Sequence, residues 1–317
     1  MMLEAINSSR LPAVFTTADK ATQMRFIDFF MANISNENTR RAYSKAVGQL
    51  LLWCDDQGVT SFPAIQPTHV AAWIEALGRT HSVPTVKQHL AAIRHLFDWL
   101  VTGQVVPVNP AASVRGPKYV VKRGKTPVLE AQETRLLLER IDTSKNVGLR
   151  DRALIGLMVY SFARIGAALS LKVEDVYTQN RRLWVRLQEK GGKQHEMPCH
   201  HNLEAWLHEY LDTAKLWNDR KGYVFRTIDR GTKELSDRPL PQANAYAMIR
   251  RRAKQAGITK PIGNHTFRAT GITAYLKNEG SLEIAARMAS HASMRTTQLY
   301  DRRADEVTLD EVERIVI

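Results

Sequence analysis

Four residues that can take part in phosphoryl transfer stand in order near the end of the chain, within residues 264–300. His265 and Arg268 are one helical turn apart, and Tyr300 follows His291 by nine residues. A tyrosine oxygen can attack phosphorus to form a covalent ester, provided that cationic donors hold the non-bridging oxygens as negative charge builds on them. The residue types therefore predict a phosphoryl-transfer site if the rest of the chain supplies more cations.

Two candidate cations lie further upstream. Arg164 follows the apolar run ALIGLMVYSF, which predicts a largely buried helix over residues 148–162. A guanidinium entering a core there needs a partner, so we expect either a carboxylate or an anionic ligand beside it. Lys190 lies in the turn EKGGK between two alternating segments, and this pattern predicts a β-hairpin over Leu183–Pro198. A lysine at a hairpin tip is more often only solubilising, so Lys190 alone carries little weight.

The composition indicates a folded, basic protein of about two domains. The chain has 317 residues, 44% of them hydrophobic. Its 45 Lys and Arg exceed its 32 Asp and Glu by 13, and the sequence pI is about 9.8. Such a charge favours a polyanionic partner, with nucleic acid ahead of an acidic membrane surface. The alternative is a basic surface that is merely solvated.

The cysteines and the apolar runs predict a cytoplasmic protein without a membrane span. Cys54 and Cys199 make no disulfide framework, and the first residues lack the pattern of a signal peptide. The apolar runs are all shorter than the ~18 residues that cross a bilayer.

A cluster of potential metal ligands lies in and directly after the second half of the hairpin, at His195, Cys199, His200 and His201. Successive strand residues point to opposite faces, and the spacing matches no common zinc pattern. The sequence also has no glycine-rich phosphate loop of the Walker type. We therefore expect neither a metal nor another cofactor.

The first third of the chain predicts a helical domain. Apolar residues recur at helical spacing over residues 24–31, in the stretch that ends at Gly58, over residues 66–78, and from Ser82 to Gly103. Basic residues off the apolar stripes are candidates for contacts with a phosphate backbone, although each one alone is more often solvated. These candidates are Arg40, Arg41, Lys45, Lys87 and Arg94.

The predicted domain plan has a tail or a short docking segment over residues 1–21, a helical domain over 22–110, a basic linker over 111–127 and a larger domain over 128–303. A C-terminal segment, 304–317, completes it. The linker contains AASVRGPKYVVKRGK, which has no acidic residue, so it either lies against phosphates or is simply solvated. Further candidate phosphate contacts are Lys118, Lys122 and Arg123 in the linker, and Arg250 and Arg251 on a helix that begins near Pro241.

Four segments taken together resemble the catalytic boxes of the tyrosine recombinases, which include phage integrases and Xer-type enzymes. They are ARIGAALSLKVEDV, LQEKGGKQHEMP, NHTFRATGIT and SHASMRTTQLYD, and the N-terminal NTRRAYSKAVGQLLLWC and SVPTVKQHLAAIRHLFDWL are similar to that family's core-binding domain. The resemblance implies a mainly α, two-domain DNA clamp. Its helical core-binding domain precedes an α-rich catalytic domain with a small antiparallel sheet.

The resemblance also implies a catalytic set, which is Arg164, Lys190, His265, Arg268, His291 and Tyr300. In the family, the tyrosine attacks a DNA phosphodiester and leaves a 3′-phosphotyrosyl link and a free 5′-hydroxyl, so no ATP is needed. Two arginines can hold the charged oxygens, and a lysine can protonate the leaving oxygen. His265 would assist deprotonation of Tyr300, and His291 would donate to a non-bridging oxygen.

The chain departs from the family pattern at two positions. Ala167 stands three residues after Arg164, where an acidic residue is common, and Ser290 stands where glycine is common. Either another carboxylate substitutes for the missing acid, with Glu174 or Asp175 as candidates, or the site is less preorganised before assembly.

The resemblance implies a site-specific recombinase that acts on double-stranded DNA with an inverted-repeat core site. It implies a homo-tetramer and a Holliday junction on DNA, and we expect a monomer or dimer without DNA. The apolar stripe of residues 304–317 either packs on its own domain or docks into a neighbouring protomer, and we favour docking. Two alternatives are a type IB topoisomerase and a catalytically silent DNA-binding regulator. The residues indicate no particular target sequence or accessory protein.

Overall fold

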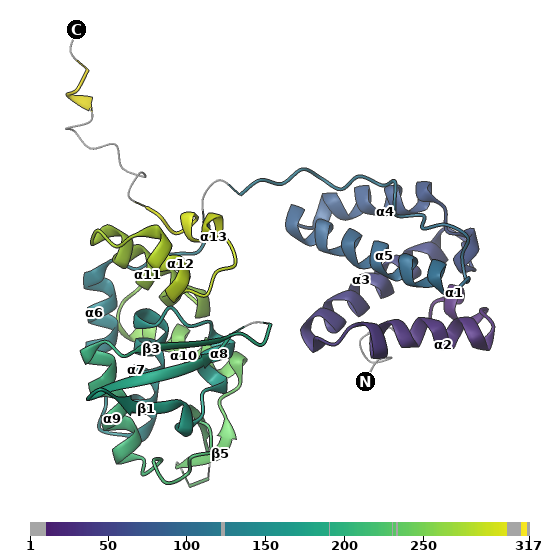
Figure 1. Cartoon of the computed structure of the whole chain (residues 1–317). Coiled ribbons are helices and arrows are strands. Elements are labelled where there is room, and N and C mark those ends of the chain that lie inside the picture. The colour runs from purple at the N-terminus through teal and green to yellow at the C-terminus, as the bar shows by residue number, and fades with distance from the viewer. Residues whose placement is uncertain are drawn as a thin grey trace. The chain divides into compact units, whose positions relative to one another are not determined.

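The structure is a computed structural model that describes residues 11–121, 124–189, 191–229, 231–232, 234–302 and 312–315. The chain divides into two compact units, Met1–Val120 and Val121–Ile317 (Figure 1). Each unit has its own hydrophobic core. The predicted fold class is confirmed, because the first unit is helical and the second combines helices with small antiparallel sheets.

The first unit is built from helices whose apolar stripes meet in one core. Its main pair consists of α3 and α5, which bury Leu50 and Phe97. The side chain of Asn36 caps α3 by accepting from the backbone N–H of Thr39 at 3.1 Å. The elements are α1 (Ala13–Thr16), α2 (Lys20–Asp28), a π-helical turn (Phe29–Asn33), α3 (Glu37–Asp56), a 3-10 turn (Phe62–Ala64), α4 (Pro67–Thr80) and α5 (Val83–Thr102).

The folded part of this unit begins before residue 22, inside the stretch that the sequence analysis places in the tail. Val14 in α1 is fully buried, and the backbone N–H of Ala13 donates to both carboxylate oxygens of Asp55, at 2.9 and 2.8 Å. Of the two expectations for this stretch, a tail or a short docking segment, α1 fits the second, because it packs on the helical unit. A helix of four residues is too short to show an apolar period, which is why the pattern missed it.

The start of the predicted linker also packs on this unit. Ala111 and Val114 are buried in its core, and the guanidinium of Arg94 donates to both of their carbonyls, through Nε to Ala111 at 3.1 Å. An extended segment leaves its carbonyls without partners, so a nearby arginine is a natural donor. Arg94, a predicted DNA contact, is thus engaged within the fold.

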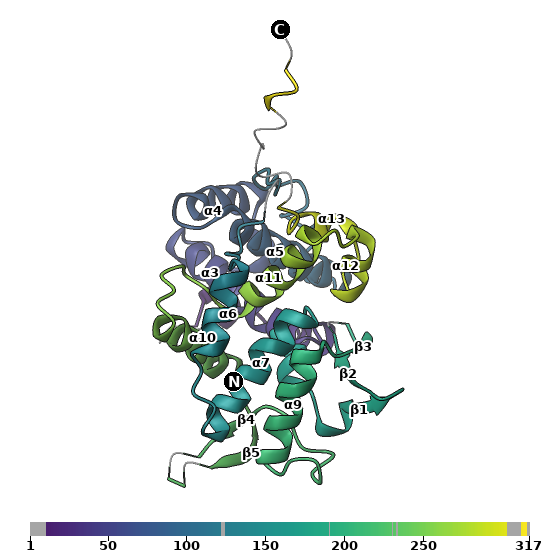
Figure 2. The same ribbon diagram turned by 90° about the vertical axis from the view of Figure 1, so that its left-hand side faces the viewer.

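The second unit is organised around the buried helix α7 (Figure 2). Leu154, Ile155 and Leu157 are fully buried, as the apolar run predicts. The remaining helices are α6 (Ala131–Glu139), α7 (Asn146–Tyr160), α8 (Ile165–Ser170), α9 (His201–Thr213), α10 (Gln242–Gln255), α11 (Asn264–Lys277), α12 (Leu282–Met288) and α13 (Met294–Gln298). Figures 1 and 2 both show α11–α13 at one end of the unit and the β4–β5 pair at the other.

Two small antiparallel sheets accompany these helices. The order of the first sheet is β1-β2-β3, and Val185 in its central strand lies opposite both Val176 and Met197. The hairpin predicted over Leu183–Pro198 is confirmed, whereas β1 and the second sheet were not predicted. The strands are β1 (Val176–Gln179), β2 (Arg182–Gln188), β3 (Gln194–Pro198), β4 (Arg226–Ile228) and β5 (Leu235–Pro239), after a 3-10 turn (Val173–Asp175).

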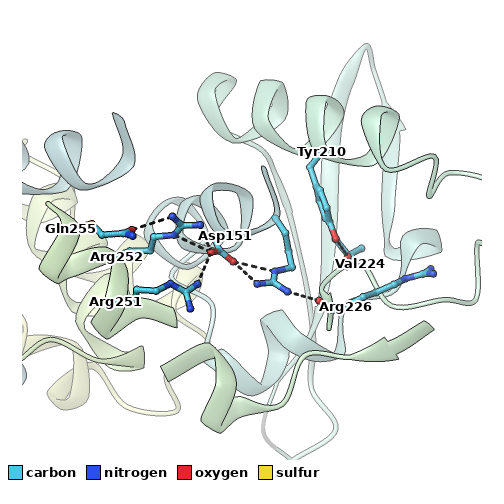
Figure 3. A network of polar contacts seen from close by, with 8 residues as sticks. Asp151, Tyr210, Val224, Arg226, Arg251, Arg252 and Gln255 are labelled. Carbon is cyan, nitrogen blue, oxygen red and sulfur yellow. Dashed lines mark hydrogen bonds and ion pairs between the residues drawn. The ribbon is translucent and has the colours of Figure 1, made fainter. Parts of the chain in front are cut away.

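A buried ion network joins α7, α10 and β4 (Figure 3). Asp151 is fully buried and accepts from Nε and Nη2 of Arg150 at 3.1 and 2.7 Å. Its other oxygen accepts from Nε and Nη2 of Arg252 at 3.0 and 2.8 Å, and Arg251 lies 3.5 Å away. Arg150 also donates to the carbonyl of Arg226 at 2.7 Å. Arg251, a predicted DNA contact, therefore pairs with this carboxylate.

We expect Asp151→Asn to lower the free energy of unfolding by about 3 kcal/mol, because two buried guanidinium groups would lose their counter-charge. A matched control is Asp237→Asn, since Asp237 pairs with Arg226 at 3.4 Å but its side chain is 100% exposed. That change should cost at most about 1 kcal/mol. Urea unfolding followed by tryptophan fluorescence compares the two variants, and equal losses would contradict a special role for the buried carboxylate.

Candidate active site

Arg164 lies at the N-cap of α8 and pairs with a carboxylate that the sequence analysis did not name. Its Nη1 donates to Oε2 of Glu189, whose side chain is 3% exposed. Glu189 directly follows β2. Of the two partners expected for Arg164, a carboxylate or an anionic ligand, the structure shows the carboxylate.

The expectation that Glu174 or Asp175 replaces the missing acid is wrong. Glu174 pairs with Lys221 at 2.8 Å, while Asp175 accepts from the backbone N–H of Lys172 at 3.1 Å. Both belong to the 3-10 turn after α8 and meet partners near that turn.

Arg268, in α11, is held by two backbone carbonyls. Its side chain is buried, with Nη1 donating to the carbonyl of Phe162 and Nη2 to that of Ala289. Gly271 allows α11 to approach α7 closely, because a Cβ there would lie 2.0 Å from the carbonyl oxygen of Val159. Burial, and then the charge of Arg164, lower the pKa of Arg268 to about 10, so the guanidinium stays charged at neutral pH.

The two carbonyls that accept from Arg268 lie at or next to residues with left-handed backbone conformation. Phe162 has φ +54°, and Ser290, which follows Ala289, has φ +48°. Ser290 is the turn residue after α12, and the backbone N–H of His291 donates to the carbonyl of Ala286 at 3.0 Å. This ending suits glycine, which explains the preference that the sequence analysis notes at position 290.

We expect Ser290→Gly to leave folding intact or to stabilise it by up to about 1 kcal/mol, because glycine takes positive φ without a Cβ penalty. Ser290→Val should destabilise by at least about 1 kcal/mol, because a β-branched side chain fits this conformation worst. Thermal unfolding of the two variants measures the difference. If valine is tolerated as well as glycine, the backbone strain at this turn has no energetic consequence.

The two histidines and Tyr300 lie around these arginines. The ring of His291 stacks on that of Tyr300, with centroids 5.9 Å apart and planes at 10°. Nδ1 of His291 lies 2.8 Å from Oγ1 of Thr297. The hydroxyl of Tyr300 is near enough to Arg268 to act on it as a hydrogen-bond partner, which raises the pKa of Arg268. These contacts gather His291, Tyr300 and Arg268 into one site.

Burial and the arginines keep both imidazoles neutral at neutral pH. The pKa of His291 falls to about 4, first through burial and then through the charges of Arg268 and Arg164. The pKa of His265 is lowered by the same causes in the same order. His265 nevertheless keeps an exposed surface, so its ring is open to a substrate.

The structure brings together five of the six predicted catalytic residues, and the sixth, Lys190, lies outside the described residues. Its neighbours are described. The backbone N–H of Glu189 donates to the carbonyl of Lys193 at 2.7 Å, and Gly191 and Gly192 take positive φ as the turn requires.

The potential metal ligands in and after β3 have other surroundings in the part of the chain that the structure describes. No group of three or more His, Cys, Asp or Glu side chains there is arranged to hold an ion. His200 instead stacks on Tyr160, with ring centroids 4.2 Å apart. Burial lowers the pKa of His195, while the charge of Glu189 acts to raise it and that of Arg268 to lower it.

The predicted phosphate contacts have different surroundings. Arg40 donates to the carbonyl of Ile34 at 2.8 Å, and Arg41 forms an exposed ion pair with Glu37 at 3.1 Å. Lys122 and Arg123 lie outside the described residues. The candidates with exposed side chains and no ion pair among the described residues are Lys45, Lys87, Lys118 and Arg250.

Two cations, two neutral imidazoles and one phenol hydroxyl thus meet in a site that suits a phosphodiester. A comparison of the sequence with models of protein families agrees with this interpretation. The model of the phage integrase family matches residues 127–306, which is more than half of the chain. The chain belongs to the phage integrase family of tyrosine recombinases. A second model, the family's N-terminal SAM-like domain, matches residues 25–104.

This membership confirms the predicted activity, that of a tyrosine-type site-specific recombinase, a DNA strand transferase. Among curated relatives, the chain is 29% identical to tyrosine recombinase XerD of Chlorobaculum tepidum over 270 residues, or 83% of this chain and 85% of the relative. It is 24% identical to tyrosine recombinase XerC of Escherichia coli over 259 residues, or 81% of this chain and 83% of the relative.

Solved structures share the fold of this phage integrase family member. One is the XerH recombinase bound to a palindromic difH substrate after cleavage, with a TM-score of 0.71, 19% identity, and 98% of this chain and 86% of that chain covered. Another is a lambda integrase tetramer bound to a Holliday junction, with a TM-score of 0.68, 16% identity, and 95% and 85% covered.

The described helices include none that is both long enough and apolar enough to cross a membrane.

Proposed function

We propose that this phage integrase family member cuts and rejoins double-stranded DNA at a specific site through a 3′-phosphotyrosyl link at Tyr300. The observation that carries the proposal is the meeting of Tyr300, His291 and Arg268 in one site, with Arg164 close enough for its charge to lower the pKa of both His291 and Arg268. A phosphodiester is the DNA group whose charge two guanidinium ions complement.

In the proposed reaction, the oxygen of Tyr300 forms a bond to phosphorus while the bond from phosphorus to the 5′-oxygen breaks. Arg164 and Arg268 hold the non-bridging oxygens, on which charge gathers in the transition state. His265 is neutral and can take the phenol proton, and His291 donates to a non-bridging oxygen. Lys190 gives a proton to the leaving oxygen. The phosphotyrosyl bond keeps its energy for the reverse attack by another 5′-hydroxyl.

We propose an inverted-repeat core site as the DNA partner and a cytoplasmic location where that DNA lies. The exposed cations Lys45, Lys87 and Lys118 of the first unit, and Arg250 of the second, are the proposed contacts with the phosphate backbone. Two solved relatives support this view, since one is bound to a palindromic substrate and another is a tetramer on a Holliday junction.

A suicide substrate tests the chemistry. The target site is first selected from random duplexes by binding to the wild-type chain, and a nick is then placed near the cleavage position so that the released fragment diffuses away. We expect a covalent adduct on a denaturing gel, and peptide mapping should place the DNA on Tyr300. Binding without an adduct would favour the silent regulator. Relaxation of supercoiled DNA without exchange between two sites would favour the topoisomerase.

We also propose that the wild-type chain assembles as a tetramer in which the C-terminal segment, residues 304–317, is exchanged between protomers. Most of that segment lies outside the described residues, but Val312 and Ile315 are 49% and 69% exposed. Deleting residues 308–317 should weaken cooperative assembly on DNA by roughly tenfold or more while the monomer still folds. Gel-shift titration measures this, and an unchanged tetramer after deletion would contradict the exchange.

A further inference from the structure

The carboxylate of Glu189 is placed in the site by a contact that spans two segments of the catalytic unit. Arg164 is the N-cap of α8, whereas Glu189 directly follows β2, 25 residues later. The Glu189 side chain is only 3% exposed, while that of Arg164 is 30% exposed. The carboxylate thus contacts the guanidinium from the protein interior, and the rest of the guanidinium stays accessible to a ligand.

Glu189 is held through its backbone as well as through its side chain. Its backbone N–H donates to the carbonyl of Lys193 at 2.7 Å, which closes the hairpin around the turn. Lys190 is the next residue in the chain. The ion pair between Glu189 and Arg164 therefore connects the base of the turn to the start of α8.

The contact leaves most of the Arg164 fork open. Among the residues that the structure describes, its hydrogen bonding involves Nη1 alone, so Nε and Nη2 remain available for two oxygens of a phosphate. The negative charge of Glu189 also offsets the repulsion between Arg164 and Arg268, since it raises the pKa of Arg268, which Arg164 lowers.

Ala167 presents only a methyl group on α8 at the neighbouring position. It stands three residues after Arg164 on the same helix end, and it is buried. Residues three apart are neighbours on a helix surface, so an acidic side chain at 167 would also reach toward Arg164. Among the residues that the structure describes, the one carboxylate paired with Arg164 therefore comes from the hairpin and not from the helix.

We propose that Glu189 is a positioning residue that orients Arg164 toward the scissile phosphate and ties it to the hairpin turn that carries Lys190. This inference rests on the proposed function and deepens it. Glu189 touches neither DNA nor the reacting atoms in this scheme, and it acts only through Arg164.

The test compares single-turnover adduct formation, DNA affinity and thermal stability in full-length variants on the selected suicide substrate. Glu189→Gln should slow adduct formation by about 10²-fold, because a misplaced catalytic group costs that much, while the Kd for the same duplex changes by no more than about threefold. The matched control is Glu196→Gln, since Glu196 lies in the same hairpin and pairs with Arg186 at 2.6 Å, outside the site. It should cleave at the wild-type rate.

Rescue separates positioning from a merely structural role. Adding Ala167→Glu to Glu189→Gln should recover at least about tenfold of the lost rate, because the helix then supplies the carboxylate. If that double variant does not fold, Ala167→Asp replaces it, and if neither folds, the rate loss of Glu189→Gln at unchanged Kd and unfolding midpoint decides.

The inference is overturned if Glu189→Gln cleaves at the wild-type rate, if its loss only follows the unfolded fraction, or if a folded double variant recovers nothing. A wild-type chain that forms no adduct would instead overturn the proposed function. The two failures are therefore distinguishable.

Discussion

Tyr300→Phe is expected to bind DNA as tightly as the wild-type chain and to form no covalent adduct, a loss of more than about 10⁴-fold in cleavage. The change removes one oxygen atom and leaves the ring in place. Its stack on His291 at 5.9 Å and its packing near Phe162 and Ile272 do not require the hydroxyl. A denaturing gel of protein on labelled suicide substrate measures the adduct, and a native gel measures binding.

Tyr275→Phe is the matched control for this change. Tyr275 packs against the same small core as Tyr300, with its ring edge-on to Phe162 at 6.1 Å. It should keep the adduct at the wild-type level. If Tyr300→Phe still becomes attached to DNA, another residue is the nucleophile, and if both variants lose the adduct, the cause is packing and not chemistry.

The parts of the fold that follow from periodicity and capping could be predicted from the sequence. The buried run in α7, the stop of α3 before Gly58 and the hairpin around EKGGK are local patterns with a direct physical cause. The order of the four boxes likewise indicated the family, because each box contains the residues that the chemistry requires.

Contacts between distant segments could not be predicted in the same way. The sequence does not indicate which of its many carboxylates pairs with Arg164. Glu189 gives no signal of its own, because it is one residue of the turn that was singled out only for Lys190. Arg94 and Arg251 look like solvent-facing cations by helical position, yet one donates to carbonyls and the other pairs with Asp151. Basic residues on a helix are therefore weak guides to DNA contacts until their partners are known.

Backbone strain and catalytic geometry meet at Arg268. Phe162 and Ser290 both have positive φ, and the carbonyls that hold Arg268 belong to Phe162 and to Ala289, which precedes Ser290. Such conformations cost about 1 to 3 kcal/mol each and persist only where the surrounding structure fixes them. Here they aim two carbonyls at one guanidinium, which the backbone thus holds in a fixed orientation.

Arg268→Lys should therefore damage both folding and chemistry. A lysine keeps the charge, but its compact ammonium cannot serve two carbonyls and a phosphate in one plane. We expect adduct formation to slow by roughly 10³-fold, a typical loss for a cation that stabilises a phosphoryl transition state. The unsatisfied carbonyl groups should lower the free energy of unfolding by about 2 kcal/mol. Single-turnover cleavage and urea unfolding measure the two effects.

Arg164→Lys separates these effects, because Arg164 is 30% exposed and an ammonium can still meet Glu189. Its cleavage should also slow, by at least about 10²-fold, whereas its stability should change by less than about 0.5 kcal/mol. If Arg268→Lys proves as stable as Arg164→Lys, the two carbonyl contacts do not hold the site together. If Arg268→Lys cleaves at the wild-type rate, a positive charge alone is enough there, and the fixed plane of the guanidinium is not what the transition state requires.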